Sequence, residues 1–268
     1  MQTIRFIFSD LDGTLLNSQK EVSDETIATI QELKKHGFKF GIATGRPKVG
    51  IENNWKQWRI DEYADFVVGS NGGVIWDLTN HTYKDTHLLQ PETMQNIYEL
   101  VKQYKPNFYQ YGEQVVYAHR MDERAQKNGA MNKVEVQQKD VSEMMQQPCH
   151  KFSMLFPAEH IQDVLAILDK EQGKGFHYVQ PIENYIEFSD PRVMKSYGIQ
   201  TAIAPYQADL SNVIVFGDEG NDLEMLTKAG IGVCMKNGTD LAKSHADEIT
   251  DYTNEESGVV RHLKKKFL

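Results

Sequence analysis

The chain has 268 residues, two cysteines and a formal net charge of −9 at neutral pH. Hydrophobic residues make up 40% of it and charged residues 25%, which is ordinary for a globular protein and excludes a disordered chain, a collagen or a long coiled coil. The acidic charge disfavours nucleic acid and anionic membranes as partners. The basic run of Lys264, Lys265 and Lys266 is interpreted as the end of a helix, where cations complement the helix dipole.

The sequence also predicts the compartment in which the protein works. It holds no run of about 18 apolar residues, so we expect no membrane-spanning helix. The N-terminal segment reaches Asp10 too soon to contain the apolar stretch of a signal peptide. Cys149 and Cys234 lie far apart, which excludes a disulfide scaffold and favours the reducing cytoplasm.

The first part of the chain alternates strands and helices. Ile4–Phe8 is a nearly continuous apolar run, which predicts a strand buried on both faces. A helix is expected to begin after Ser23 as its N-cap and to end at Gly37. Phe38–Ala43 and Phe66–Val68 are the next two apolar runs. Strand, helix and strand in this order predict βαβ units in a parallel sheet.

The middle of the chain has a different pattern. It combines amphipathic helical segments with aromatic, strand-like stretches, which predicts a separate α+β module. The first pattern returns after Asp190, with apolar strands at Asn212–Phe216 and Ile231–Met235. Helices are expected through Met225 and over residues 239–246.

This change of pattern predicts two domains. We expect an α/β core formed by residues 1–82 and 190–268, interrupted by an α+β module at residues 83–189.

Polar clusters follow three of the predicted strands. They are Asp10-Leu11-Asp12-Gly13-Thr14, Thr44-Gly45-Arg46-Pro47 and Gly217-Asp218-Glu219-Gly220-Asn221-Asp222. Ligands of open parallel sheets bind beyond the carboxyl ends of the strands, so we expect the three clusters to share one crevice. Taken alone, each cluster also fits a surface turn or a helix N-cap. Their common position after an apolar strand is what indicates a site.

Four carboxylates, those of Asp10, Asp12, Asp218 and Asp222, are expected to converge in this crevice. Two such charges about 4 Å apart repel by roughly 4 kcal/mol at an effective dielectric constant of about 20, so the cluster needs a cation or a proton. A site of oxygen ligands with few carboxylates suits Mg²⁺. None of the nine histidines pairs with another ligand at zinc-like spacing, which disfavours zinc.

Other catalytic motifs are absent. Gly230–Met235 begins like a dinucleotide-binding fingerprint but lacks the third glycine, and no Walker A sequence is present. The loop at Ser70 is not a nucleophile elbow. A lone lysine such as Lys195 is ordinarily a solvated surface residue, so it carries no prediction by itself.

Together, these motifs resemble those of the haloacid dehalogenase (HAD) superfamily, and most of all its Cof-type branch of small-molecule phosphatases. Four motifs match in order: FSDLDGTLL with Asp10, Asp12 and Thr14, GIATGRP with Thr44, VMKSYGI with Lys195, and GDEGND with Asp218, Asn221 and Asp222. Ser70-Asn71-Gly72-Gly73 matches a further loop of that branch. The resemblance spans almost the whole chain but is thin between residues 85 and 185, and the wording Asp190-Pro191-Arg192 ahead of Lys195 is unusual.

The resemblance implies a Rossmann-like, parallel-sheet HAD core with an inserted cap of the C2, type B, class. It implies a Mg²⁺-dependent phosphatase that acts on small phosphorylated metabolites, such as sugar phosphates or phosphorylated cofactors. Asp10 would be the nucleophile that forms an aspartyl-phosphate, and Asp12 would be the general acid and base. Mg²⁺ would be held by Asp10, the Asp12 carbonyl and Asp218, with support from Asp222.

The resemblance also implies how the substrate is bound. Thr44 and Lys195 would bind phosphoryl oxygens, together with the backbone N–H groups of Leu11 and Gly45 and the side chain of Asn221. Arg46 and Asn71 would face the leaving group. The cap would open and close over the crevice about hinges near residues 80–86 and 186–191.

Two other functions stay open on the sequence. A phosphomutase would return the phosphoryl group to a sugar, and a non-catalytic sensor would use the same pocket to bind a phosphorylated ligand. An acid and base at Asp12 favours turnover to water. Four tyrosines of the middle module are candidates for substrate contact because aromatic side chains suit apolar pocket walls, although packing explains each of them as well. They are Tyr109, Tyr111, Tyr117 and Tyr185.

Overall fold

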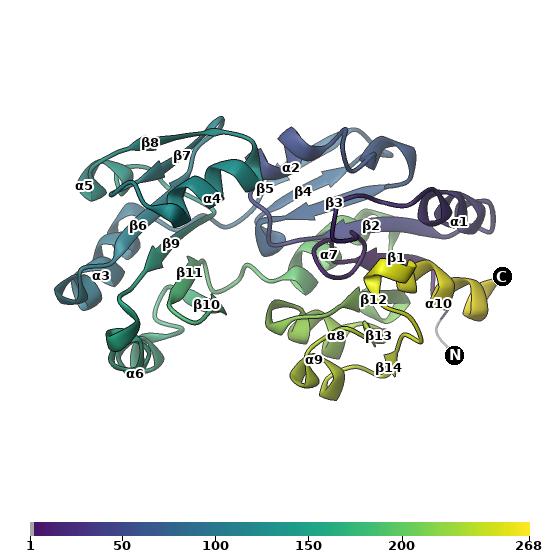
Figure 1. Cartoon of the computed structure of the whole chain (residues 1–268). Coiled ribbons are helices and arrows are strands. Elements are labelled where there is room, and N and C mark those ends of the chain that lie inside the picture. The colour runs from purple at the N-terminus through teal and green to yellow at the C-terminus, as the bar shows by residue number, and fades with distance from the viewer. Residues whose placement is uncertain (1–2) are drawn as a thin grey trace. The chain divides into compact units, whose positions relative to one another are not determined.

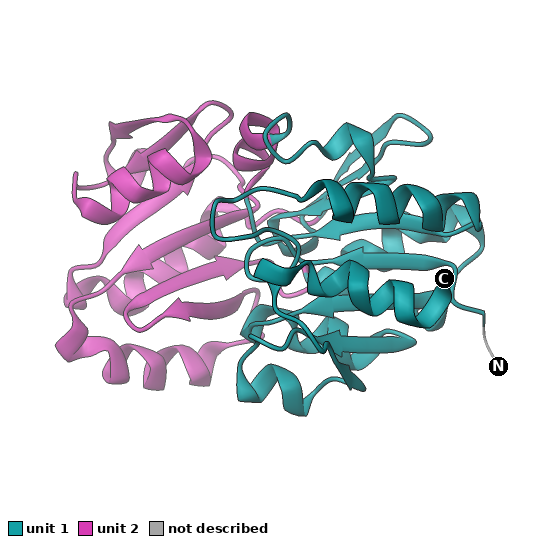
Figure 2. Cartoon of the chain, turned by 45° about the vertical axis from the view of Figure 1, so that its right-hand side comes forward, with its two compact units in different colours: residues 1–46, 55–86, 194–268 teal, residues 47–54, 87–193 magenta. Residues whose placement is uncertain are grey.

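The computed structural model describes residues 3–268 and consists of two compact units (Figure 2). Unit 1 holds the described residues up to Arg46 together with Trp55–Thr86 and Met194–Leu268. Unit 2 holds Pro47–Asn54 and His87–Val193. The long insertion therefore begins at His87 and ends at Val193. The short segment Pro47–Asn54 groups with it, a feature that the sequence patterns did not reveal.

Unit 1 is built on an eight-stranded sheet in the order β14-β13-β12-β1-β2-β3-β4-β5 (Figure 1). The strands from β14 to β3 run parallel, and β4 and β5 extend the sheet in antiparallel fashion. Their bounds are β1 Phe6–Ser9, β2 Lys39–Ala43, β3 Phe66–Gly69, β4 Val74–Asp77, β5 Thr82–Asp85, β12 Val213–Gly217, β13 Ile231–Cys234 and β14 Glu248–Ile249.

The helices of unit 1 contact the strands of this sheet or one another. They are α1 Asp24–Lys35, α7 Lys195–Ile203, α8 Leu223–Lys228, α9 Asp240–Ser244 and α10 Gly258–Phe267. β1, β3 and β12 are buried along their whole length, as continuous apolar runs in a parallel sheet require. α1 begins as expected because the Ser23 hydroxyl accepts a hydrogen bond from the N–H of Thr26 at 3.1 Å. α1 and α10 lie side by side.

The strand order of unit 1 reverses around β1. The chain continues from β1 to β2 and β3 on one side, and later adds β12, β13 and β14 on the other. In sheets of this kind, the ligand crevice lies beyond the carboxyl ends of the strands at such a reversal. The topology therefore singles out the ends of β1 and β12.

Unit 2 has its own six-stranded sheet, in the order β10-β11-β9-β6-β7-β8, antiparallel except for the β7–β8 pair. Its strands are β6 Asn107–Tyr111, β7 Val115–Ala118, β8 Glu135–Gln138, β9 Lys151–Leu155, β10 His177–Ile182 and β11 Tyr185–Ser189. Its helices are α2 Lys48–Asn54, α3 Pro91–Val101, α4 Glu123–Asn132, α5 Val141–Met144 and α6 Ile161–Glu171. α3 and α6 supply Met94, Ile97, Val164 and Leu168 to a core around Phe152.

The expected α/β core with an α+β insertion is confirmed, and the predicted core strands lie within two residues of the observed ones. The residues Lys264, Lys265 and Lys266 form the last turn of α10, as interpreted. The antiparallel strands β4 and β5 and the elements α4 and β8 were not predicted. Within residues 3–268, no helix has the length and apolar character needed to cross a membrane.

Candidate active site

The parallel register brings the first predicted cluster beside the last one. Ser9, the end of β1, pairs with Phe216 of β12 and with Ile42 of β2. The N–H of Asp10 continues the ladder by donating to the Phe216 carbonyl at 2.9 Å. The residues that follow these three strands therefore lie along one edge of the sheet, where the sequence predicted a common crevice.

Three carboxylates gather at this edge. Asp10, Asp218 and Asp222 are all buried, and each offers an oxygen within 4.8 Å of the others. The Lys195 ammonium lies between two of them, with Nζ 2.7 Å from Asp10 Oδ1 and 2.6 Å from Asp222 Oδ1. The side chain of Lys195 is wholly buried, so the expectation for a lone surface lysine does not hold here.

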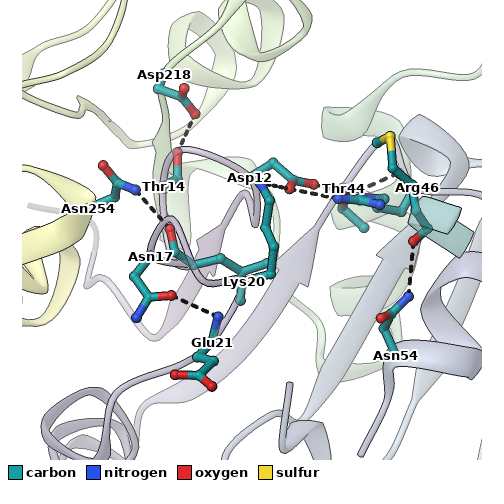
Figure 3. Close-up of polar contacts among 12 residues, drawn as sticks. Asp12, Thr14, Asn17, Lys20, Glu21, Thr44, Arg46, Asn54, Asp218 and Asn254 are labelled. Carbon is teal, nitrogen blue, oxygen red and sulfur yellow. Dashed lines mark hydrogen bonds and ion pairs between the residues drawn. The ribbon is translucent and has the colours of Figure 1, made fainter. Parts of the chain in front are cut away.

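Backbone groups and one hydroxyl fix the orientation of these acids. Asp222 Oδ2 accepts hydrogen bonds from the N–H groups of Asp218 at 2.9 Å and Glu219 at 3.2 Å. Thr14 Oγ1 donates to Asp218 Oδ1 at 2.6 Å (Figure 3). Gly13 has a φ of +81°, and a Cβ there would lie 2.3 Å from Asp218 Oδ2, so only glycine permits this close approach.

The protonation of the cluster reflects its burial. Burial is the main cause that raises the pKa of Asp10 well above its usual value; Lys195 opposes this, and Asp222 and Asp218 add to it. Burial likewise raises the pKa of Asp218 to about 7, although the hydrogen bond from Thr14 opposes it. A single ammonium therefore does not neutralise three carboxylates.

This donor set fits a hard divalent cation. Carboxylate oxygens are the ligands that such ions take, and a cation beside Asp10 and Asp218 would remove the electrostatic cost of ionising both groups. The Asp12 side chain is not part of the cluster, because its carboxylate is bound elsewhere.

Arg46 and Lys20 hold the Asp12 carboxylate. Arg46 donates from Nε to Oδ2 at 2.7 Å and from Nη2 to Oδ1 at 2.8 Å, and Lys20 Nζ lies 2.7 Å from Oδ1 (Figure 3). Burial opposes ionisation, but Arg46 and then Lys20 outweigh it and lower the pKa of Asp12 to about 2. The Arg46 guanidinium also lies 5.7 Å from the ring centre of the buried Trp58.

Lys20 was not predicted from the sequence. It lies in a loop, its backbone has a φ of +60°, and nothing in the local pattern signals that its ammonium reaches Asp12.

The turn after β2 lies against two asparagines. A Cβ on Gly45 would meet Asn71 Oδ1 at 3.0 Å and Asn221 Nδ2 at 3.5 Å, so both amides flank the Gly45 backbone. Thr44 Oγ1 accepts from the N–H of Arg46 at 3.2 Å, and the Thr44 carbonyl accepts from the N–H of Asn71 at 3.0 Å. Leu11, which is fully buried, follows Asp10 directly.

The Asn71 loop carries backbone strain. Ser70 and Asn71 have φ values of +49° and +55°, in the left-handed region that non-glycine residues rarely adopt. Asn71 Oδ1 is buried and has no hydrogen-bond partner among the residues that the structure describes. Strain and an unsatisfied buried acceptor beside the Gly45 turn are typical of residues kept for binding a ligand.

Of the four tyrosine candidates in unit 2, three belong to its packing. Tyr109 and Tyr185 are fully buried with ring centres 5.9 Å apart, and the Tyr109 hydroxyl donates to Asp122 at 2.6 Å. Tyr117 is partly buried and packs against the core of unit 2.

Comparisons with known proteins match almost the whole chain. The sequence profile of the haloacid dehalogenase-like hydrolases matches residues 7–263. The 5-amino-6-(5-phospho-D-ribitylamino)uracil phosphatase YitU of Bacillus subtilis is 32% identical, over 100% of this chain and 99% of that protein. The phosphatase YcsE of the same organism, which has the same descriptive name, is 27% identical over 97% and 95% of the two chains.

A solved structure has the same fold. A haloacid dehalogenase-like hydrolase from Bacteroides thetaiotaomicron superposes with a TM-score of 0.83 at 25% identity, over 99% of this chain and 100% of that one. The motif resemblance is confirmed on these grounds, and the chain belongs to the haloacid dehalogenase-like hydrolases.

Proposed function

We propose that this phosphatase hydrolyses the phosphate monoesters of small metabolites through a phosphoryl group carried on Asp10, with Mg²⁺ bound beside it. One observation carries the proposal: the Asp10 carboxylate lies with Asp218 and Asp222 within 4.8 Å, and a fully buried lysine faces it at 2.7 Å. Such a site offers a nucleophile, a place for a divalent cation and a fixed positive charge for a phosphoryl group.

Asp10 performs the first step. Its free carboxylate oxygen attacks phosphorus, the bond between phosphorus and the ester oxygen breaks, and the phosphoryl group passes to Asp10. Lys195 favours the ionised form of Asp10, because the ammonium lies 2.7 Å from Oδ1, although burial still raises the pKa of Asp10 well above its usual value. Water then attacks phosphorus, phosphate leaves, and the Asp10 carboxylate is restored.

Asp12 moves the protons of both steps. It gives a proton to the ester oxygen as that group leaves, and then takes a proton from the attacking water. Ion pairs with Arg46 and Lys20 hold Asp12 ionised in this structure, so its acid role requires that these pairs loosen when the substrate binds. Arg46 and Lys20 therefore set how readily Asp12 takes up the proton that it gives to the ester oxygen.

The transferred phosphoryl group needs donors on every side. Lys195 and Thr44 supply side-chain donors, Leu11 and Gly45 supply backbone N–H groups, and Asn221 supplies its amide. Asn221 Nδ2 lies beside Gly45, which supports a joint role for these two residues. Arg46 and Asn71 face the leaving group, and Asn71 brings an acceptor that no protein group satisfies.

Asp10, the carbonyl of Asp12 and Asp218 would hold Mg²⁺, and Asp222 would support them through its hydrogen bonds to the Asp218 and Glu219 backbone. When bound, the ion polarises the phosphoryl oxygens and offsets the negative charge of the cluster.

The substrate is a small phosphorylated compound. Two relatives act on 5-amino-6-(5-phospho-D-ribitylamino)uracil, so this compound belongs in a substrate panel with sugar phosphates and phosphorylated cofactors.

The test is phosphate release from that panel, measured with Mg²⁺, with EDTA and with the variant Asp10→Asn. Release is expected only when both Mg²⁺ and Asp10 are present. The matched control is Asp251→Asn, which removes an exposed carboxylate that pairs with Lys265, and it should act like the parent. Release that survives EDTA or Asp10→Asn would contradict the mechanism.

A further inference from the structure

Helix α7 begins without a cap of its own. Its first residue is Lys195, and the side chain of the preceding N-cap, Met194, accepts no hydrogen bond from the first N–H groups of the helix. The first N–H groups of a helix have no partner within the helix, and a Ser, Thr, Asp or Asn at the N-cap ordinarily supplies one. A methionine thioether is a poor substitute, so α7 needs a partner from another element.

Glu224 of α8 supplies that partner. Its Oε1 accepts a hydrogen bond from the N–H of Ser196, the second residue of α7, at 2.8 Å. A carboxylate at this end of a helix also faces the positive end of the helix dipole. Glu224 therefore caps α7 although it belongs to a different helix, α8.

The first turn of α7 also lies in close contact with the loop at Gly72. A Cβ on Gly72 would lie 2.2 Å from the Met194 carbonyl, and one on Gly198 would lie 2.8 Å from the Gly72 Cα. The backbone of α7 thus rests directly on the loop after β3. Glu224 and Gly72 fix the start of the helix by separate contacts.

We propose that Glu224 is a positioning residue that sets where the Lys195 ammonium stands between Asp10 and Asp222. This inference rests on the proposed function. Glu224 lies two residues after Asp222, so one short segment carries both a carboxylate that binds the ammonium and the group that holds the helix bearing it. A shift at the start of α7 would change the distances from Lys195 Nζ to Asp10 and to Asp222 together.

The hydrogen bond from Ser196 to Glu224 positions α7, and the ion pair between Glu224 and Lys228 does not. Glu224 Oε2 makes no hydrogen bond within residues 3–268 and lies 3.6 Å from Lys228 Nζ, whose side chain is 52% exposed. A pair of this length with a half-exposed lysine contributes little. Lys228 Nζ also lies 3.9 Å from Met194 Sδ, so Lys228→Met removes the ion pair together with this long contact and leaves the hydrogen bond from Ser196 to Glu224 in place.

The experiment compares Glu224→Ala, Glu224→Gln, Lys228→Met and Ser23→Ala for kcat, KM and melting temperature with p-nitrophenyl phosphate and Mg²⁺. Glu224→Ala should lower kcat on the order of 10- to 100-fold, since small displacements of a reacting group cost that much. Glu224→Gln keeps an acceptor and should stay within about threefold of the parent, because only the charge is lost. Lys228→Met and Ser23→Ala should match the parent; Ser23 caps the remote helix α1, so it controls for lost stability alone.

A second readout follows the lysine itself. Reductive methylation and peptide mass spectrometry should leave Lys195 unmodified in the parent and in Ser23→Ala, because its side chain is fully buried. In Glu224→Ala the same lysine should become modified. If Glu224→Ala does not fold, Glu224→Asp replaces it, because the shorter side chain withdraws the acceptor.

Two results would overturn the inference. One is a Glu224→Ala protein that keeps the parent kcat and an unmodified Lys195. The other is a Glu224→Gln protein as impaired as Glu224→Ala. A parent that releases no phosphate refutes the proposed function instead, and the labelling of Lys195 then still decides whether Glu224 positions it.

Discussion

Asp218 has two neighbouring carboxylates, and its protonation therefore links the site to the stability of the chain. Its pKa rises from 3.8 to about 7 on folding, chiefly through burial. A group of this kind binds more protons in the folded state than in the unfolded state. Its contribution to stability is complete below about pH 4 and is lost as the pH rises through about 7. Asp10 acts in the same direction.

We therefore expect the metal-free protein to lose stability between about pH 4 and pH 7. In EDTA, the free energy of unfolding should fall across this range by up to roughly 4 kcal/mol from Asp218 alone. Asp218→Asn should flatten the profile, because an amide does not titrate. Mg²⁺ at neutral pH should restore stability in the parent more than in the variant. Urea unfolding at several pH values measures this, and equal slopes in both proteins would contradict the assignment.

Residues of the site were predicted where they occupy motif positions and missed where they do not. Asp10, Thr14, Asp218 and Asp222 follow apolar strands at fixed motif positions, and the register of β1 with β12 brings them together. Lys20 reaches Asp12 from a loop, and no periodicity marks it. Lys20 and Asp12 are only eight residues apart, but their contact depends on the path of the loop between them, which the residue types do not specify.

At the scale of elements, helix α4 shows how a cap can organise its surroundings. Asp122 is its N-cap, and Oδ1 accepts from the N–H of Ala125 at 2.7 Å. Oδ2 accepts from the Tyr109 hydroxyl at 2.6 Å and from Asn107 Nδ2 at 2.7 Å. Burial alone would raise the pKa of Asp122, but the hydrogen bonds from these three donors outweigh burial, so the pKa is lowered. One carboxylate therefore ties α4 to strand β6.

Asp122→Ala is expected to destabilise unit 2. The cap contributes about 1 kcal/mol, and leaving the buried polar groups of Tyr109 and Asn107 with fewer partners adds roughly 1–3 kcal/mol. Asp122→Asn keeps the cap and should lose less. Chemical denaturation measures both, with Asp140→Ala as the matched control, since Asp140 precedes α5 without capping it through its side chain. A control loss as large as that of Asp122→Ala would refute this account.

The elements themselves were predictable in proportion to their hydrophobic pattern. Ser23 and the apolar face of α1 identified that helix, and β1 and β12 were visible as unbroken apolar runs. β5 is wholly exposed and α4 is polar overall, so neither has a pattern that separates it from a loop. α2 belongs to unit 2 because it packs against α4, and the sequence of α2 alone does not reveal that contact.

At the scale of the whole molecule, the two units carry distinct core clusters. One cluster lies entirely in unit 1 and includes Phe8, Phe66 and Val215. Another lies entirely in unit 2, where Phe152 stacks between Phe108 and Phe188 at ring separations of 4.7 and 4.8 Å. Buried apolar area is the main source of folding energy, so each unit has its own source of stability.

This division predicts that a core defect stays within its unit. Phe152→Ala should cost about 3–5 kcal/mol, because it removes a fully buried ring from a stack. Hydrogen exchange should then quicken in β6, β9 and β11 and much less in β1 and β12. Phe66→Ala is the matched variant, since Phe66 is equally buried in unit 1, and it should quicken exchange in β1, β2 and β3. Equal loss of protection across both sheets in either variant would mean that the chain unfolds as one cooperative body, and that its cores are not energetically separate.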